Sequence, residues 1–184
     1  MVNTQNFFSL LIVFLLACLP LNAESGEYAP KILRAGLISS ESGLLVDTQI
    51  DYQLSPAAKE ALTKGVALVW KVRLELRRPG LFWNKTVYRQ KLTYTLQYHA
   101  LLNQYAVEVG GQSEMFLSLN AALNYMATLH PSPVIDPALI GDGDQLAIKT
   151  QFRRESLPVP LRPFAYLDPQ WSLSSDWFLW PIPK

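Results

Sequence analysis

Two histidines, His99 and His130, are the side chains in this sequence best suited to acid–base chemistry near neutral pH. His99 stands at the end of a predicted strand, and His130 directly precedes Pro131. A nucleophilic site would need a Ser, Thr or Cys held against one of these rings, and the spacing favours no particular hydroxyl. The sequence contains no Gly-x-Ser-x-Gly elbow, phosphate-binding loop, dinucleotide fingerprint or His-Glu-x-x-His zinc helix. We therefore expect both histidines to be structural or solvated.

The segment Gly141-Asp142-Gly143-Asp144 could offer two carboxylates to a cation, with Asp136 as a third ligand. A calcium loop needs more oxygen ligands at fixed spacing and usually a distal Glu, whereas Glu155 lies eleven residues beyond Asp144. Gly and Asp are also the residues that tight turns prefer. The segment therefore predicts a turn, and we expect neither a metal site nor a cofactor.

Two glutamates, Glu75 and Glu108, could act together in sugar hydrolysis, which needs a paired acid and base. Glu75 lies among Lys71, Arg73 and Arg77, and these cations would keep its carboxylate ionised. The pattern therefore predicts an ion-paired surface glutamate, and no catalytic residue is assigned. A hydrolase acting on a cell-wall or lipid substrate is the alternative to a non-enzymatic role.

The charges are strongly segregated along the chain. Residues 59–91 contain nine Lys or Arg against two glutamates, and residues 92–148 contain five acidic residues and no Lys or Arg. Strand alternation places five of the cations on the solvent-facing sides of successive strands, namely Lys71, Arg73, Arg77, Arg89 and Lys91. We treat this basic face as the candidate binding surface.

Two interpretations of the basic face remain open. It is either a solvated surface, with Asp47 and Asp51 on the preceding strand offsetting its charge, or the binding site of an anionic partner. Such a partner would be a lipid head group, a cell-wall polymer, or the acidic surface of an envelope or membrane protein. The net charge of the whole chain is only +1, so nothing indicates nucleic acid.

The N-terminus predicts export. Phe7 to Leu21 are apolar except for Ser9, and this run is too short to span a bilayer as a helix. Ala23 provides a cleavage point, so residues 1–23 are predicted to be a signal peptide, although the first ten residues contain no Lys or Arg. Alternatives are lipidation at Cys18 or an uncleaved anchor. Each places residues 24–184 outside the cytoplasm, as a periplasmic or envelope-associated protein.

The whole sequence has 184 residues, of which 49% are hydrophobic and 17% charged, as in a globular protein, so residues 24–184 are expected to form one domain. The only Cys is in the leader, which excludes a disulfide framework. Apolar and polar residues alternate with a period of two, which is typical of half-buried antiparallel strands. Strands are expected over residues 44–54, 66–76, 88–98 and 146–152, with weaker ones over 32–38 and 105–109.

Two short helices are expected between these strands. Ser55-Pro56 is an N-cap followed by Pro, and Gly65 is a stop signal, so a helix is predicted over Pro56–Lys64. A second helix is predicted to start near Met115 or Ser118, with one apolar stripe, and to end before Pro131. The expected fold is therefore mostly β: a single antiparallel β-sandwich-like domain of six or seven strands with two short helices.

The last segment, residues 157–184, is rich in Pro and Trp. Its Pro content excludes a long helix or a central strand, so we expect an extended segment packed on the domain, with a short strand over residues 177–180. Its large aromatic residues either pack back on the domain, which we prefer, or lie at a membrane interface. They are Trp171, Trp177, Phe178 and Trp180.

Several pieces of the sequence together form a recognisable pattern. They are the tail pieces Leu157–Arg162 and Trp171–Trp177, the helix start Leu54-Ser55-Pro56, and the segments Tyr98–Leu101 and Phe116–Leu119. With these pieces the chain resembles the bacterial envelope family known as domain of unknown function 4390. The resemblance covers most of residues 31–182 and implies an envelope-facing protein, with a hint of membrane signalling. It transfers no activity and no catalytic residues. We therefore expect a non-enzymatic binding or adaptor module.

Overall fold

The computed structural model describes residues 26–81 and 83–183. The predicted leader, including Cys18, lies outside these residues. Within them, nine strands, three short α-helices and several single 3-10 turns follow one another. No helix in the described ranges is long and apolar enough to cross a membrane.

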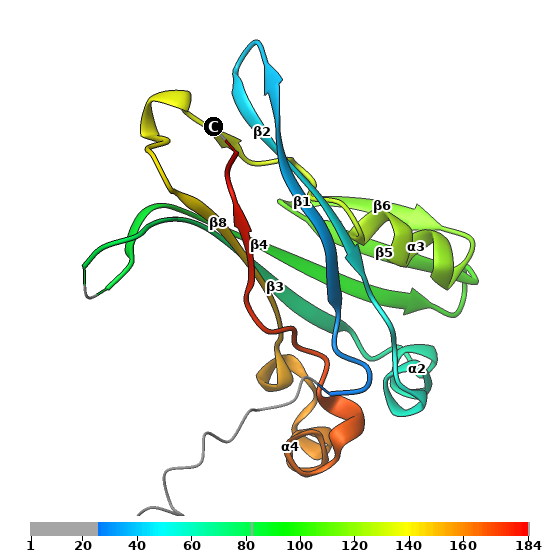
Figure 1. Cartoon of the computed structure of the whole chain (residues 1–184). Helices are drawn as coiled ribbons and strands as arrows, with labels where there is room; N and C mark the ends of the chain where they lie inside the picture. The colour runs from blue at the N-terminus through cyan, green and yellow to red at the C-terminus, as the bar shows by residue number, and fades with distance from the viewer. Residues whose placement is uncertain (1–25, 82, 184) are drawn as a thin grey trace, which may run out of the picture.

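The strands form two antiparallel sheets (Figure 1). The elements are β1 (Lys31–Ser40), β2 (Gly43–Asp51), α2 (Pro56–Thr63), β3 (Leu68–Arg78), β4 (Lys85–His99), β5 (Gln104–Val109), β6 (Gln112–Phe116), α3 (Leu119–Met126), β7 (Val134–Ile135), β8 (Gln145–Phe152), α4 (Arg162–Leu167) and β9 (Phe178–Pro181). The small sheet has the order β1-β2-β7, and the large sheet has the order β6-β5-β4-β3-β8-β9. The predicted mostly β, antiparallel sandwich-like fold is confirmed, with more strands and one more helix than expected.

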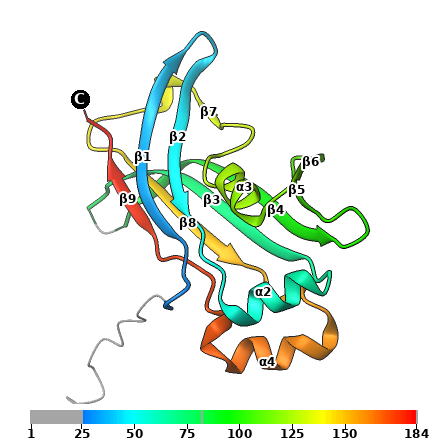
Figure 2. The ribbon, with the colours of Figure 1, turned by 90° about the vertical axis from the view of Figure 1, so that its right-hand side faces the viewer.

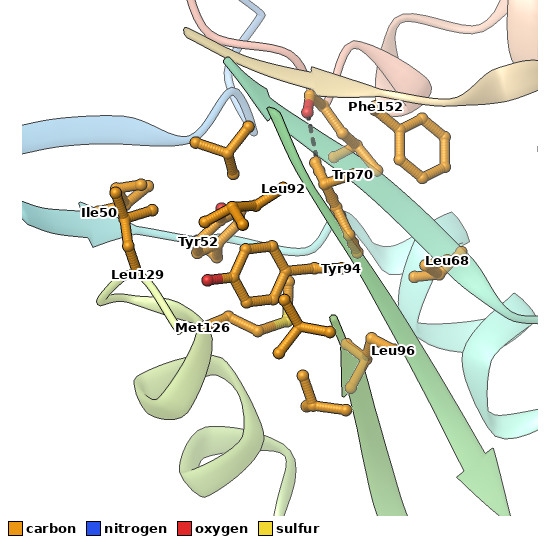
Figure 3. Packing of buried hydrophobic residues seen from close by; sticks show 14 of the residues in the cluster. Ile50, Tyr52, Leu68, Trp70, Leu92, Tyr94, Leu96, Met126, Leu129 and Phe152 are labelled. Atoms are coloured by element: carbon orange, nitrogen blue, oxygen red, sulfur yellow. Dashed lines mark hydrogen bonds between the residues drawn. The ribbon is translucent and has the colours of Figure 1, made fainter. Parts of the chain in front are cut away.

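The β1–β2 hairpin crosses one face of the large sheet, and the core lies between them (Figures 1 and 2). Alternation in β3 sends Trp70, Val72 and Leu74 to this inner face, where all three are buried. Trp70 packs edge-on against Tyr52 and tilted against Phe152 (Figure 3). The outer face of the large sheet is therefore left to the alternate residues of β3, β4 and β8.

The predicted cap of the first helix forms. Ser55 Oγ accepts a hydrogen bond from Ala58 N at 3.1 Å, and Gly65, after the end of α2, has a φ of 82°. Ser118 likewise caps α3, but Phe116 belongs to β6 rather than to this helix. The reason is the Gly110-Gly111 turn, which reverses the chain and pairs β6 with β5 before the helix can start.

The C-terminal segment is only partly extended. Residues 154–171 form α4 and three single 3-10 turns, whereas an extended segment was predicted. Beyond them, two serines bind the chain to β8: Ser174 Oγ accepts from Phe152 N, and Ser175 Oγ accepts from Thr150 N, both at 2.9 Å. The backbone N–H of Ser175 also donates to Thr150 O at 2.8 Å. The chain then pairs with β8 as β9, an edge strand that tolerates Pro181.

Candidate functional site: the basic face of the large sheet

Three cations stand side by side on the outer face of the large sheet. In the strand register, Arg73 of β3 lies opposite Lys91 of β4 on one side and Lys149 of β8 on the other. Adjacent strands are about 4.8 Å apart, so the three residues span roughly 10 Å. Like charges placed directly opposite one another destabilise a sheet. A row of this kind therefore has an unfavourable charge arrangement that a bound anion would relieve.

Two further observations describe the surroundings of this row. The Nε–H of Arg73 is buried and has no acceptor among the described residues. Lys71, two residues from Arg73 on β3, has a lowered pKa, because the charge of Arg153 opposes its protonation, with smaller effects from burial, Lys91 and Arg73 and an opposing effect from Glu155. We define the basic row as Lys71, Arg73, Lys91 and Lys149.

The other two predicted cations, Arg77 and Arg89, are already paired. Both bind Glu75: Arg77 Nε donates to Oε2 at 2.9 Å and Arg89 Nε donates to Oε1 at 3.0 Å. The Arg77 guanidinium also lies 4.0 Å from the centre of the Trp177 ring. Glu75 was expected on the surface, but it is only 6% exposed, because these side chains cover it. The predicted set of five cations therefore divides into Lys71, Arg73 and Lys91 in the row, and Arg77 and Arg89 in a closed ion-pair cluster.

Lys149 was missed by sequence reasoning. Its outward position follows from alternation, since Ile148 and Thr150 are buried. Its place beside Arg73 depends on β8 pairing with β3, which no local pattern indicates.

The proposed compensation by Asp47 and Asp51 does not occur on this face. Both residues belong to β2 in the small sheet. Asp47 lies 2.9 Å from Arg34 of the neighbouring strand β1, and Asp51 accepts a hydrogen bond from Gln53. The expected offset by these two residues is wrong because β2 and β3, although consecutive, lie in different sheets, whereas the choice between a solvated surface and a binding site stays open.

A polar hollow of about 370 Å³ opens beside the row. Lys149, Gln151 and Arg154 contribute cationic and amide groups to it, while Asp176 and Glu155 contribute carboxylates. Arg154 is also committed to the backbone, because it donates to Trp171 O at 3.2 Å. The mixed charge makes this hollow a poorer anion site than the row itself.

His130 is next to a hydroxyl, but its contacts are those of a structural cluster. Its Nε2 lies 2.8 Å from Thr128 Oγ1, and its ring stacks on Tyr125 at 4.2 Å. Its backbone N–H donates to Tyr94 Oη at 2.8 Å, and burial raises the pKa of Tyr94 to about 12. Among the described hydrogen bonds, no carboxylate orients the His130 ring as a catalytic triad would require.

His99 and the two glutamates are also not arranged as a hydrolytic site. His99 lines a surface hollow with the exposed Leu101 and Leu102 at the β4–β5 turn. Glu75 lies opposite Arg89 and Glu108 opposite Thr95, six residues further along β4, or about 20 Å at the rise of an extended strand. Paired glycosidase carboxylates need to be roughly 5–9.5 Å apart.

The acidic residues near 140 serve the fold. Asp144 is buried and accepts two hydrogen bonds from Arg78, at 2.9 Å each, and one from Gly141 N at 2.8 Å. Asp136 caps a 3-10 turn by accepting from Ala138 N. Across residues 26–81 and 83–183, no group of three or more His, Cys, Asp or Glu is placed to hold a metal ion.

Comparison with known proteins gives one assignment. The sequence profile of the family described as "Domain of unknown function (DUF4390)" matches residues 29–181, which include every strand and helix described above. No curated protein and no solved structure matches the chain. The extent of the profile match shows that this chain belongs to the DUF4390 family.

Proposed function

We propose that this protein is a non-enzymatic binding module whose basic row takes an anionic partner. The observation that carries the proposal is the alignment of Lys91, Arg73 and Lys149 across three paired strands. A folded sheet gains nothing from three like charges in register. An anion lying across the strands would neutralise these charges.

The test is a titration of the protein with short-chain polyphosphate, used as a generic polyanion. Binding is measured by isothermal titration calorimetry at low salt. Reversing two charges of the row, Arg73→Glu with Lys91→Glu, is expected to weaken polyphosphate binding at least tenfold. A tenfold change in affinity corresponds to about 1.4 kcal/mol of binding free energy. Binding by the parent protein should weaken as salt screens the charges. The fold should survive, because both side chains leave the sheet on its outer face.

The matched control reverses two exposed lysines of equal charge, Lys59 and Lys64, at the α2 end of the molecule. Polyphosphate affinity should then change less than about twofold. Glu75→Gln removes the carboxylate that neutralises Arg77 and Arg89 on the same face and should strengthen binding. If both double variants lose the same affinity, the basic face is an ordinary solvated surface and the proposal fails.

A hydrolytic role is not supported by any described arrangement. The His130 ring has a hydroxyl neighbour in Thr128. The backbone N–H of His130 donates to Tyr94 Oη, so the contacts of this residue tie it to its structural neighbours. The basic row has no nucleophile–base pair within it. A binding role requires only the charge arrangement that is present.

We also propose that the protein acts outside the cytoplasm, in the periplasm or on the envelope. The support is the short apolar run from Phe7 to Leu21 followed by Ala23. N-terminal sequencing of protein extracted from the envelope is expected to begin at Glu24. A lipidated first residue at Cys18 would assign it to the lipoproteins, and an intact Met1 would contradict cleavage.

A further inference from the structure

The β3–β4 hairpin ends in a turn that exposes two large apolar side chains. Leu81 is 95% exposed and Trp83 is 85% exposed. Figure 1 shows this end of the hairpin reaching beyond the rest of the large sheet. Single exposed apolar residues are ordinary in soluble proteins, whereas a Leu and a Trp exposed together at a projecting tip form a candidate interaction site.

The tip is held by the strands beneath it. The β3–β4 ladder continues to its base, where Arg78 pairs with Lys85. Gly80 closes the turn: a Cβ at this position would lie 2.4 Å from the carbonyl oxygen of Trp83, so the two backbones approach as only Gly permits. Leu81 and Trp83 therefore belong to a tight turn, and the paired strands β3 and β4 hold that turn at its base.

The charges around the tip identify the partner. From Leu76 to Leu92 the hairpin carries five Lys or Arg and no Asp or Glu. Arg77 and Arg89 pair with Glu75, and Arg78 pairs with Asp144, so Lys85 and Lys91 are the cations of this hairpin outside those ion pairs. Lys85, two residues from Trp83, is exposed, and the Arg89 side chain is 53% exposed although it contacts Glu75. Trp is favoured at membrane–water interfaces, and cations near an anionic leaflet each strengthen association about fivefold. An apolar tip with a cationic base matches the charge and polarity profile of an anionic bilayer surface.

We propose that the β3–β4 tip inserts Leu81 and Trp83 into the interfacial layer of an anionic lipid bilayer. Lys85 would then lie at the head groups. The inference rests on the proposed function, because it identifies the anionic partner as lipid phosphate. The tip also adds an apolar contact with the bilayer, which the basic row does not provide.

A fluorophore at the tip tests insertion directly. Cys18 is the only cysteine, so protein beginning at Glu24, which retains every described contact, has none. Leu81→Cys labelled with an environment-sensitive dye should shift to the blue with vesicles of phosphatidylglycerol and phosphatidylcholine, and should not shift with phosphatidylcholine alone. The proposal would be overturned if the labelled protein sedimented with the anionic vesicles but its dye emission did not shift. Equal emission shifts with the two kinds of vesicle would also overturn it.

Paired variants separate this proposal from the basic row. Trp83→Ser should weaken sedimentation with anionic vesicles about tenfold and leave polyphosphate affinity unchanged. Phe164→Ser, which removes an aromatic ring of similar exposure from α4, should change neither measurement. Arg73→Glu with Lys91→Glu should weaken both. Equal effects of Trp83→Ser and Phe164→Ser on vesicle binding would refute the tip, whereas an unaltered polyphosphate titration in the row variant would refute the proposed function.

Discussion

Replacing Trp171 by alanine is expected to lower the free energy of unfolding by about 3–5 kcal/mol, the usual cost of truncating a buried aromatic residue. Trp171 is 4% exposed, and its ring stacks on Phe152 at 5.9 Å. The centre of the Phe152 ring in turn lies 5.2 Å from the centre of the Trp70 ring. The indole N–H of Trp70 donates a hydrogen bond to Leu173 O at 3.0 Å. Loss of the Trp171 ring would leave a cavity where the C-terminal segment joins the core.

Denaturant unfolding measures this change, and two other Trp→Ala variants calibrate it. Trp83→Ala, at an exposed position, should alter stability by no more than about 0.5 kcal/mol. Trp177→Ala should give an intermediate loss, because Trp177 is half-buried and stacked with Arg77 on the outer face. If Trp171→Ala unfolds at the same denaturant concentration as Trp83→Ala, the C-terminal segment does not stabilise the domain.

The second large effect is expected at Asp144. Asp144→Asn removes the charge that holds Arg78 through two hydrogen bonds, and hydrogen bonds to charged groups contribute about 1.5–3 kcal/mol. The matched control is Asp136→Asn, because Asn caps as well as Asp and this residue is exposed. Thermal unfolding should therefore show a lower melting temperature for the first variant only.

Asp144 is also expected to make the free energy of unfolding depend on pH. The hydrogen bond from Arg78, assisted by that of Gly141 and opposed by burial, lowers the pKa of Asp144 in the folded protein. A carboxyl whose pKa is lowered by folding contributes its full stability above its unfolded value, near 4, and loses it as the pH falls through the folded value. The parent protein should lose stability on acidification below about pH 4, and Asp144→Asn should lose less. Parallel acid profiles for the two proteins would contradict this assignment.

The strands and caps could be predicted from the sequence because they depend on neighbouring residues. Alternation placed Lys71, Arg73 and Lys91 on one side of their strands, and the structure agrees. Ser55 was recognised as a cap from the Pro that follows it. The family profile, too, corresponds to sequence pieces that can be recognised without coordinates.

The positions of the strands relative to one another could not be predicted in this way. Periodicity reports which face of a strand a residue occupies, but the partner strand and its register are set by contacts far apart in the chain. For this reason Lys149 joined the basic row unexpectedly, and Asp47 was expected to offset the basic face although it lies in the other sheet. Glu75 was expected at the surface although its partners bury it.

The sequence by itself determined a mostly β chain of amphipathic strands, with a basic stretch and a short apolar run near the N-terminus, because these are properties of composition and local spacing. Only the tertiary structure decided which cations stand in one row, which are neutralised by Glu75, and which aromatic residues are buried. Trp171 and Trp83 illustrate the distinction: the same side chain lies in the core at one position and projects from a hairpin tip at the other. The physical reason is that burial and charge compensation depend on what packs against a residue, and in this fold those neighbours come from distant segments.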